Sequence, residues 1–176
     1  MRIWVFSPII NVIVRIEKIF KGQAMWFSKK SNKSKFSPVQ FGEIGEAEAL
    51  RFLLSKQYRI VATNFLAPLG RSFRGRPITG EIDIIAYDSK NILRFIEVKT
   101  RRSKEIASPE SAVDLTKQRK IIKTARIYRR IFRLTEEPYD YDVVSVVKLS
   151  DKEFNVELLS GYFPENRFTK SRWFRS

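Results

Sequence analysis

The sequence of 176 residues contains no cysteine and no histidine. The first absence excludes disulfides and thiolate metal sites, and the second excludes the common zinc sites and acid–base catalysis by histidine. An enzyme with this composition has to work with carboxylates, lysine and a hard cation. The missing cysteines are compatible with a reducing cytoplasm, which is where we expect the protein to act.

Acidic residues are scarce relative to basic ones. The chain has 34 Lys and Arg against 19 Asp and Glu, which gives a formal net charge of +15. Such a balance predicts a polyanionic partner, nucleic acid first and an anionic membrane surface second. The hydrophobic fraction of 43% is that of a folded protein, and the length fits one domain with a core of its own.

The chain also lacks a long apolar run. The segment Ile3–Val14 is apolar but is interrupted by Pro8 and Asn11, and it falls short of the roughly 20 residues that a membrane-spanning helix needs. We therefore expect no membrane span. Residues 1–40 are basic and end in a Ser/Lys-rich stretch, which predicts a flexible extension; a helix lying on a membrane surface and a translation start at Met25 are the alternatives. Residues 41–160 form the expected domain, and 161–176 a basic tail.

Two acidic strands in the middle of the chain carry the main functional pattern. The segments 80–85 and 95–99 are rich in Ile, Val and Phe and are joined through turn-forming residues, so they predict an antiparallel hairpin. Asp83 then lies opposite or nearly opposite Glu97, with the side chains roughly 5 Å apart if they share a face. Two carboxylates this close repel unless a cation lies between them, and oxygen ligands suit Mg²⁺ or Mn²⁺.

Lys99 follows Glu97 by two residues and points to the same side of the strand. A lysine there positions or deprotonates an attacking water, or offsets charge on a phosphate. The three side chains are typical of a metal-dependent phosphodiesterase. The alternative is a cross-strand ion-pair cluster on a solvated face.

A helix is predicted over Phe41–Tyr58, followed by a strand over Tyr58–Leu66. On the helical wheel Glu46 falls within the apolar arc, where a carboxylate needs a partner such as a metal site; the other interpretation is a first turn exposed enough for Glu46 to complement the helix dipole. The segment Ala67–Pro77 is expected to be a long connection. Its three arginines, Arg74 among them, either follow a phosphate backbone or are simply solvated.

A second helix is predicted over Asp114–Phe132, with strands over Tyr141–Leu149 and Phe154–Leu159 after it. The helix has two faces. The apolar one comprises Ile121, Ile122, Ala125, Tyr128 and Phe132, and the opposite one comprises Arg119, Lys123, Arg126 and Arg130. Aligned like charges repel, and a polyanion along this face would remove that penalty.

The ordered set of these motifs resembles a known family. The motif residues are Gly42–Ala49, Asn64, Gly80–Ala86, Phe95–Arg101, Lys117, Gln118, Ala125, Tyr128 and Tyr141–Val144. Together they are similar to the YraN-like family of uncharacterised bacterial proteins, within the restriction-endonuclease-like superfamily that carries the D…(D/E)xK motif. The resemblance covers about residues 41–160 and implies an α/β fold with the order α-β-β-β-α-β, a mixed sheet flanked by helices.

The resemblance also implies roles for single residues. Asp83 and Glu97 would bind the metal with the backbone carbonyl of Val98, Lys99 would act on the water, and Glu46 would complete the site. Gln118 would contact phosphate or water. The chain departs from the family pattern in the longer Ala67–Pro77 segment and in Asp140, which precedes the fourth strand where the family has arginine.

Two functions are expected from these observations. The first is a Mg²⁺- or Mn²⁺-dependent endonuclease acting on nucleic acid, most naturally DNA, with a homodimer as one way to cut both strands. The second is a non-catalytic nucleic-acid-binding module with the same fold. The residues expected to contact nucleic acid in either case are Gln118, Lys117, Arg119, Lys123, Arg126, Arg130, Arg101 and Arg74.

Overall fold

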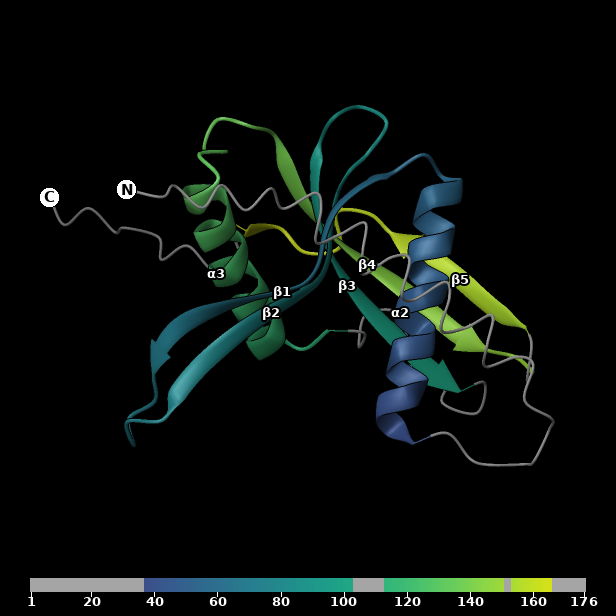
Figure 1. Ribbon diagram of the computed structural model, residues 1–176, viewed down its shortest axis with the longest axis horizontal. Coiled ribbons are helices and arrows are strands. Elements are labelled where there is room, and N and C mark those ends of the chain that lie inside the picture. Colours follow the sequence, from purple (N-terminus) through teal and green to yellow (C-terminus); the bar gives the residue numbers. More distant parts are fainter. Residues whose placement is uncertain (1–36, 103–112, 151–152, 166–176) are drawn as a thin grey trace, which may run out of the picture.

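The computed structural model describes residues 37–102, 113–150 and 153–165. The extension predicted over residues 1–40 therefore lies outside the described residues except for its last four positions, and most of the basic tail lies outside them as well. The described chain forms two helices and five strands (Figure 1). The elements are α2 (Pro38–Ser55), β1 (Arg59–Arg71), β2 (Pro77–Tyr87), β3 (Leu93–Arg102), α3 (Leu115–Ile131), β4 (Tyr139–Lys148) and β5 (Phe154–Leu159).

The five strands form one mixed sheet in the order β1-β2-β3-β4-β5. Neighbouring strands are antiparallel except β3 and β4, which pair in parallel along the whole of β3. A parallel pair needs a crossover connection, and α3 lies within it. The predicted order α-β-β-β-α-β is confirmed, and so is the additional strand at Phe154–Leu159. The result is a single α/β domain consistent with a restriction-endonuclease-like fold.

The two helices cover opposite faces of the sheet. Side chains of β3 alternate between them, because Phe95 belongs to the core beneath α3 and Ile96 to the core beneath α2. In α3 the predicted apolar face is buried from Ile121 to Tyr128, while Phe132, just after the last turn, is partly exposed. Figure 1 shows α2 and α3 on either side of the strands, with β1 and β2 extending past α3.

Each helix begins at a residue that satisfies its first free backbone N–H groups. Ser37 accepts from the backbone of Gln40, and the Gln40 side chain accepts from the backbone of Ser37. Asp114 accepts from the backbone N–H groups of Thr116 and Lys117, at 2.8 and 2.9 Å. The first helix thus begins three residues before its predicted start at Phe41 and also ends earlier than predicted.

The segment Ala67–Pro77 is not the long connection that the sequence predicted. β1 continues to Arg71 and stays paired with β2 as far as Pro77. Proline at position 68 is tolerated because β1 is an edge strand, and the pairing register shifts between Pro68 and Gly70. The connection therefore shrinks to residues 72–76, at the tip of a two-stranded arm.

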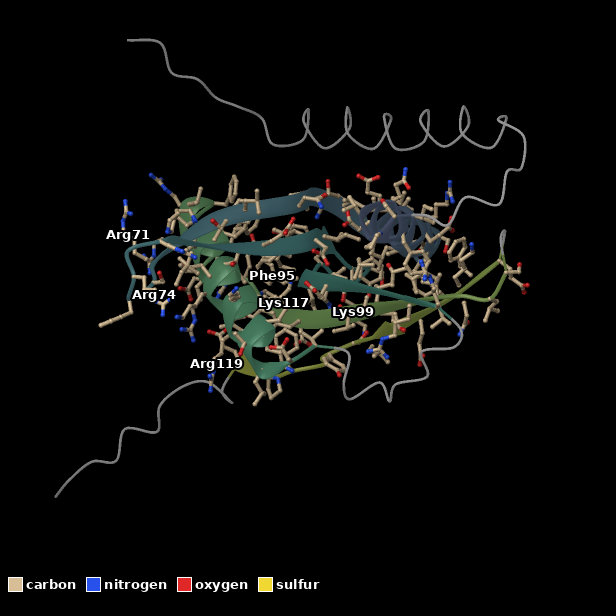
Figure 2. All side chains as sticks on the ribbon, turned by 90° about the horizontal axis from the view of Figure 1, so that it is seen from below. Arg71, Arg74, Phe95, Lys99, Lys117 and Arg119 are labelled. Atoms are coloured by element: carbon tan, nitrogen blue, oxygen red, sulfur yellow. The ribbon has the colours of Figure 1, made fainter. Side chains whose placement is uncertain are left out.

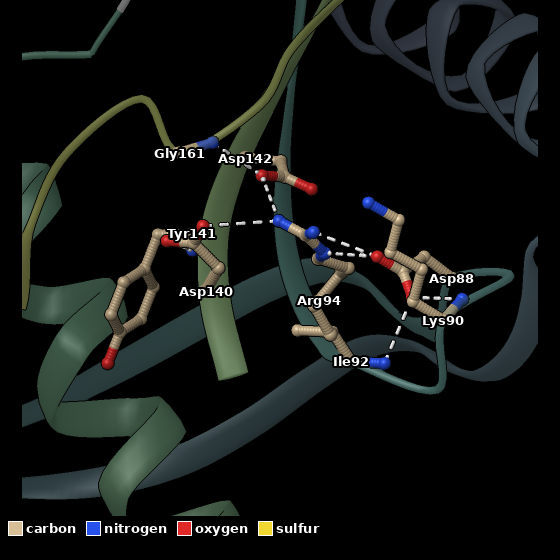
Figure 3. Close-up of polar contacts among 8 residues, drawn as sticks. All are labelled: Asp88, Lys90, Ile92, Arg94, Asp140, Tyr141, Asp142 and Gly161. Carbon is tan, nitrogen blue, oxygen red and sulfur yellow. Dashed lines mark hydrogen bonds and ion pairs between the residues drawn. The ribbon is translucent and has the colours of Figure 1, made fainter. Parts of the chain in front are cut away.

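A buried arginine joins β3 to its neighbours (Figure 3). The Arg94 guanidinium donates to Asp88 in the β2–β3 turn at 2.8 and 3.0 Å and to Asp140 and Asp142 of β4 at 3.2 and 3.3 Å. Asp142 also accepts from the backbone N–H of Gly161, at 2.8 Å. This network fixes the register of β3 against β4 at one end of the sheet. No helix within the described ranges is long and apolar enough to cross a membrane.

Candidate active site

The candidate site lies where β2 separates from β3. The two strands pair from Tyr87 and Leu93 as far as Ile84 and Ile96, and the next residues along them are Asp83 and Glu97. At this point the Asp83 side chain takes the place of a backbone acceptor from β2, because its Oδ2 accepts the N–H of Val98 at 2.7 Å. The carboxylate of Asp83 is thereby held over β3, beside Glu97.

Glu97 is buried on the α3 face of the sheet, with 5% of its surface exposed. Burial, and then the neighbouring Asp83 carboxylate, raise the pKa of Glu97 from 4.5 to about 8, against the opposing effect of Lys117. A raised pKa of this kind arises when two carboxylates share a poorly solvated site without enough positive charge. The predicted proximity of Asp83 and Glu97 is confirmed.

Lys117 supplies positive charge to this pair from the first turn of α3. Its Nζ lies 3.0 Å from Oε2 of Glu97, and its side chain is about one-third exposed. Burial lowers the pKa of Lys117, but the charges of Glu97 and Asp83 outweigh that effect and raise it overall. From the sequence Lys117 was expected only as a nucleic-acid contact, and its ion pair with Glu97 was not predicted.

Lys99 lies on the same face of β3 as Glu97 and is exposed to solvent. Hydrogen bonds from the backbone of Lys117 and Thr116 lower the pKa of the N-cap residue Asp114, and the nearby charge of Lys99 adds to this effect. Figure 2 shows Lys99 on β3 and Lys117 on α3. Of these two lysines, Lys117 contacts Glu97, whereas Lys99 interacts with Asp114.

Glu46 takes a different position from the one predicted for a third ligand. It is half-buried on α2, and its Oε2 accepts from Asn64 Nδ2 at 3.0 Å. Asn64 has a φ of 51°, a conformation that asparagine tolerates better than most residues, and it lies in β1 between the partners of Ile82 and Ile84. In the described part of the chain, no group of three or more carboxylates is gathered closely enough to hold a metal ion.

Close contacts between helices and strands keep the site elements in place. A Cβ added to Gly45 of α2 would lie 1.7 Å from Oγ1 of Thr100 in β3, directly after Lys99. A Cβ added to Gly80 of β2 would lie 2.0 Å from Oγ1 of Thr124 in α3. Glycine at these two positions lets each helix approach the sheet on either side of the carboxylate pair.

The donor set fits a hard divalent cation. Asp83, Glu97 and the backbone carbonyl of Val98 are all oxygen donors, and Glu97 is a buried carboxylate short of positive charge. Mg²⁺ commonly binds through one or two carboxylates and completes its shell with water and phosphate oxygens. Two carboxylates without a third are therefore sufficient for this class of site.

The remaining predicted contact residues are dispersed. Gln118 is buried, and its Nε2 donates to the carbonyl of Val113 at 2.8 Å. Arg126 is exposed but is paired with Glu165. Arg101 is half-buried on β3. The exposed residues are Arg119, Lys123 and Arg130 on α3 and Arg74 at the tip of the arm, and Figure 2 shows Arg74 far from Lys99.

The chain has many relatives, and it matches the two described below over most of their length. It is 37% identical over 122 residues to a UPF0102 protein of Symbiobacterium thermophilum, which covers 69% of this chain and 94% of that one. It is 37% identical over 126 residues to a UPF0102 protein of Solibacter usitatus, covering 72% and 87% of the two chains. Among solved structures, the crystal structure of SSO0001 aligns at 17% identity and a TM-score of 0.39, over 92% of this chain and 66% of that one, which is too distant to support an argument.

The family model agrees with these relatives. The model described as "Uncharacterised protein family UPF0102" matches residues 45–146, a range that includes both candidate carboxylates, Lys99 and Lys117. The match extends from α2 to β4 and so spans most of the described domain. The chain therefore belongs to the uncharacterised protein family UPF0102.

Proposed function

We propose that this protein is an endonuclease that hydrolyses phosphodiester bonds in DNA with the help of Mg²⁺ or Mn²⁺. The observation that supports the proposal is the pairing of Asp83 with the buried Glu97 at the point where β2 leaves β3, with Lys99 two residues further on the same face. A buried glutamate with a raised pKa next to a second carboxylate, on the same face of a strand as an exposed lysine, is a combination found at catalytic sites.

Each residue has a role that follows from its position. Asp83, Glu97 and the Val98 carbonyl would hold the cation, which when bound draws electron density from the phosphate and lowers the pKa of a bound water. Lys99 orients the attacking water and offsets the negative charge that develops on the phosphate. The water gives up one proton to solvent as its oxygen forms a bond to phosphorus, the bond to the leaving oxygen breaks, and that oxygen takes up a proton from solvent.

The charge of the whole chain supports a nucleic-acid substrate. The formal net charge is +15, and Arg119, Lys123 and Arg130 project from α3, the helix that carries Lys117. Basic groups around a carboxylate site attract a phosphate backbone and raise its rate of encounter. A DNA substrate fits the cytoplasmic location expected from the sequence, and two copies acting together would cut both strands.

A second candidate function is supported by one contact. The Lys117 ammonium lies 3.0 Å from Glu97 and so supplies charge to the carboxylate pair without a metal. A protein in which this ion pair is permanent would be a nucleic-acid-binding module, in which the carboxylates and Lys117 serve stability. Its affinity for DNA would fall steeply with salt and would not depend on divalent cations.

Cleavage of a panel of labelled DNAs separates the two functions. Linear, flapped and four-way-junction DNAs are incubated with Mn²⁺ and with the wild-type protein, Lys99→Ala or Lys90→Ala. Both lysines are exposed, and Lys90 lies in the turn at the opposite end of β3, so it is the matched control. We expect wild type and Lys90→Ala to cleave alike and Lys99→Ala to lose about 100-fold or more in rate.

One result would argue against the proposed role of Lys99, and another against the nuclease itself. Equal cleavage by wild type and Lys99→Ala would remove Lys99 from the mechanism. Salt-sensitive binding without cleavage of any DNA by the wild type would favour the binding module.

A further inference from the structure

β1 and β2 form an arm that leaves the sheet. Between Pro77 and Asp83, β2 pairs with β1 alone, because its pairing with β3 begins only at Ile84. An isolated two-stranded hairpin is marginally stable in water. Here its base is fixed against α3 by the contact of Gly80 with Thr124. Figure 1 shows the two strands leaving the sheet together at the lower left, beyond α3.

The tip of this arm is an ordered turn. The backbone N–H of Ser72 donates to the carbonyl of Arg76 at 2.7 Å, and the N–H of Gly75 donates to the carbonyl of Ser72 at 2.8 Å. The Ser72 hydroxyl accepts from Arg76, and the Arg71 guanidinium donates to the carbonyl of Gly75. Gly75 has a φ of 73°, which glycine adopts without strain. The turn thus holds Phe73, which lies between Ser72 and Arg74, in a defined position.

The side chain of Phe73 is fully exposed, at 107% of the reference surface. The tip also presents three exposed arginines, Arg71, Arg74 and Arg76. The chain from Leu66 to Gly80 contains no acidic residue. An aromatic ring held in water among guanidinium groups has the chemistry of a surface that stacks on a base and contacts phosphates.

The arm is connected to the candidate site through one strand. Pro77 at the tip and Asp83 in the site are 83 minus 77, or six, residues apart along β2, which corresponds to at most about 20 Å. A DNA strand advances about 3.4 Å per nucleotide in a duplex. One strand can therefore touch the tip and the carboxylates at once, with about six nucleotides between them.

Bases inside an intact duplex are already stacked on both sides. A free base face is present at a nick, a flap or a fork. The geometry points to the arm as the element that binds the branch point of DNA, with Phe73 stacked on the exposed base and the three arginines on the flanking phosphates. It would set the distance between the branch and the bond presented to Asp83 and Glu97. This inference rests on the proposed function for the cleavage step, but binding at the branch can be tested without it.

The test measures binding under conditions in which no cleavage occurs. The full chain in EDTA is titrated into a flapped DNA carrying 2-aminopurine at the branch and into an unbranched duplex of equal length. The variants are Phe73→Ala, Phe73→Trp and Leu66→Ala. Leu66 is an exposed apolar residue of the same arm and serves as the matched control. Phe73 and Leu66 are both exposed in the wild type, so none of these three variants is expected to unfold.

We expect Phe73→Ala to weaken flap binding about tenfold and duplex binding less than twofold, as loss of one base–aromatic stack predicts. Phe73→Trp should keep the preference for the flap and quench the 2-aminopurine fluorescence. Leu66→Ala should behave as wild type. These results would support the proposal whether or not the wild type cleaves DNA, so a failure of the nuclease proposal would be seen separately.

Three results would overturn the proposal. The first is a wild type that binds flap and duplex equally. The second is a Phe73→Ala variant that retains the flap preference or loses flap and duplex binding in equal measure. The third is a Phe73→Ala variant with unchanged DNA binding that no longer binds vesicles containing phosphatidylglycerol, which would identify the tip as a lipid contact.

Discussion

Lys117 shows how a single side chain on a helix determines the state of a site on a strand. It is held by its own helix start, because the Asp114 carboxylate accepts its backbone N–H, and it extends its ammonium group to Glu97. Glu97 is almost fully buried, whereas Lys117 is about one-third exposed. The effect on stability of breaking this ion pair should therefore be smaller than for a fully buried pair and larger than for a pair on the surface.

Replacing Lys117 by methionine tests this pair. Above pH 8, where Glu97 is ionised, we expect the metal-free Lys117→Met protein to lose about 1–2 kcal/mol of unfolding free energy, a value discounted for the exposure of the lysine. Adding Glu97→Gln should restore most of this loss. Urea denaturation in EDTA measures both. The exposed Lys120 on the same helix provides the control, Lys120→Met, and equal stability of Lys117→Met and wild type would contradict the prediction.

At the scale of elements, α2 approaches the sheet closely at one glycine. Gly45 lies against Thr100 of β3, while Gly42, one turn earlier on the same helix, has no atom within 4 Å of an added Cβ. The two glycines therefore differ only in their surroundings. This contrast tests the close approach of helix and strand directly.

We expect Gly45→Ala to cost about 2 kcal/mol or more, because a methyl group 1.7 Å from Thr100 Oγ1 forces the helix away from β3. Gly42→Ala should gain up to about 1 kcal/mol, since alanine favours the helix. Thermal unfolding of both variants measures the difference. If the two substitutions shifted the melting temperature in the same direction, α2 would not be seated on β3 as described.

The elements differ in how well the sequence predicted them. Strand β5 and the buried face of α3 follow from alternation and helical periodicity, and both agree with the structure. The arm did not follow from the sequence, because Pro68, Gly70 and the arginines are residues typical of loops. Its strands are held by backbone hydrogen bonds to each other, which leave little trace in side-chain patterning.

The same distinction applies to the candidate site. The two-residue period of a strand places Glu97 and Lys99 on one face, and turn residues set Asp83 beside them, so these three were predictable. The ion pair of Glu97 with Lys117 depends on where α3 docks on the sheet, which no local pattern encodes. The family resemblance implied that Glu46 completes the carboxylate site; in the structure its Oε2 accepts from Asn64, and the described residues form no group of three carboxylates around a metal position.

At the scale of the whole molecule, Arg94 links the β2–β3 turn to β4. We expect Arg94→Met to cost about 3–5 kcal/mol at neutral pH, because it leaves the buried Asp142 and its neighbours without a cation. Lys90→Met, which changes an exposed cation in the same turn, is the control.

The pH dependence of the Arg94→Met variant follows from the charges that Arg94 contacts. Burial alone would raise the pKa of Asp88, but backbone donation from Ile92 and the Arg94 guanidinium lower it overall, so its stabilising effect is present above the usual pKa of 3.8 and is lost as the pH falls. Once protonated, the aspartates carry no negative charge for the guanidinium to balance. The deficit of the variant should therefore shrink as the pH is lowered below 3.8, measured by urea denaturation from neutral pH into that range, and a deficit independent of pH would contradict this account.

The division of β2 between two partners has a consequence for the order of folding. The β1–β2 hairpin closes between residues near in sequence, whereas β3 meets β4 only after the chain has passed through α3. Contacts of short sequence separation form early and those that close long loops form late. Asp83 and Glu97 belong to β2 and β3, which also form a hairpin between residues near in sequence, whereas Lys117 belongs to the crossover that follows. A partly folded chain can therefore bring the two carboxylates together before Lys117 reaches Glu97, and during synthesis this ion pair forms only after α3 has been made and has packed on the sheet.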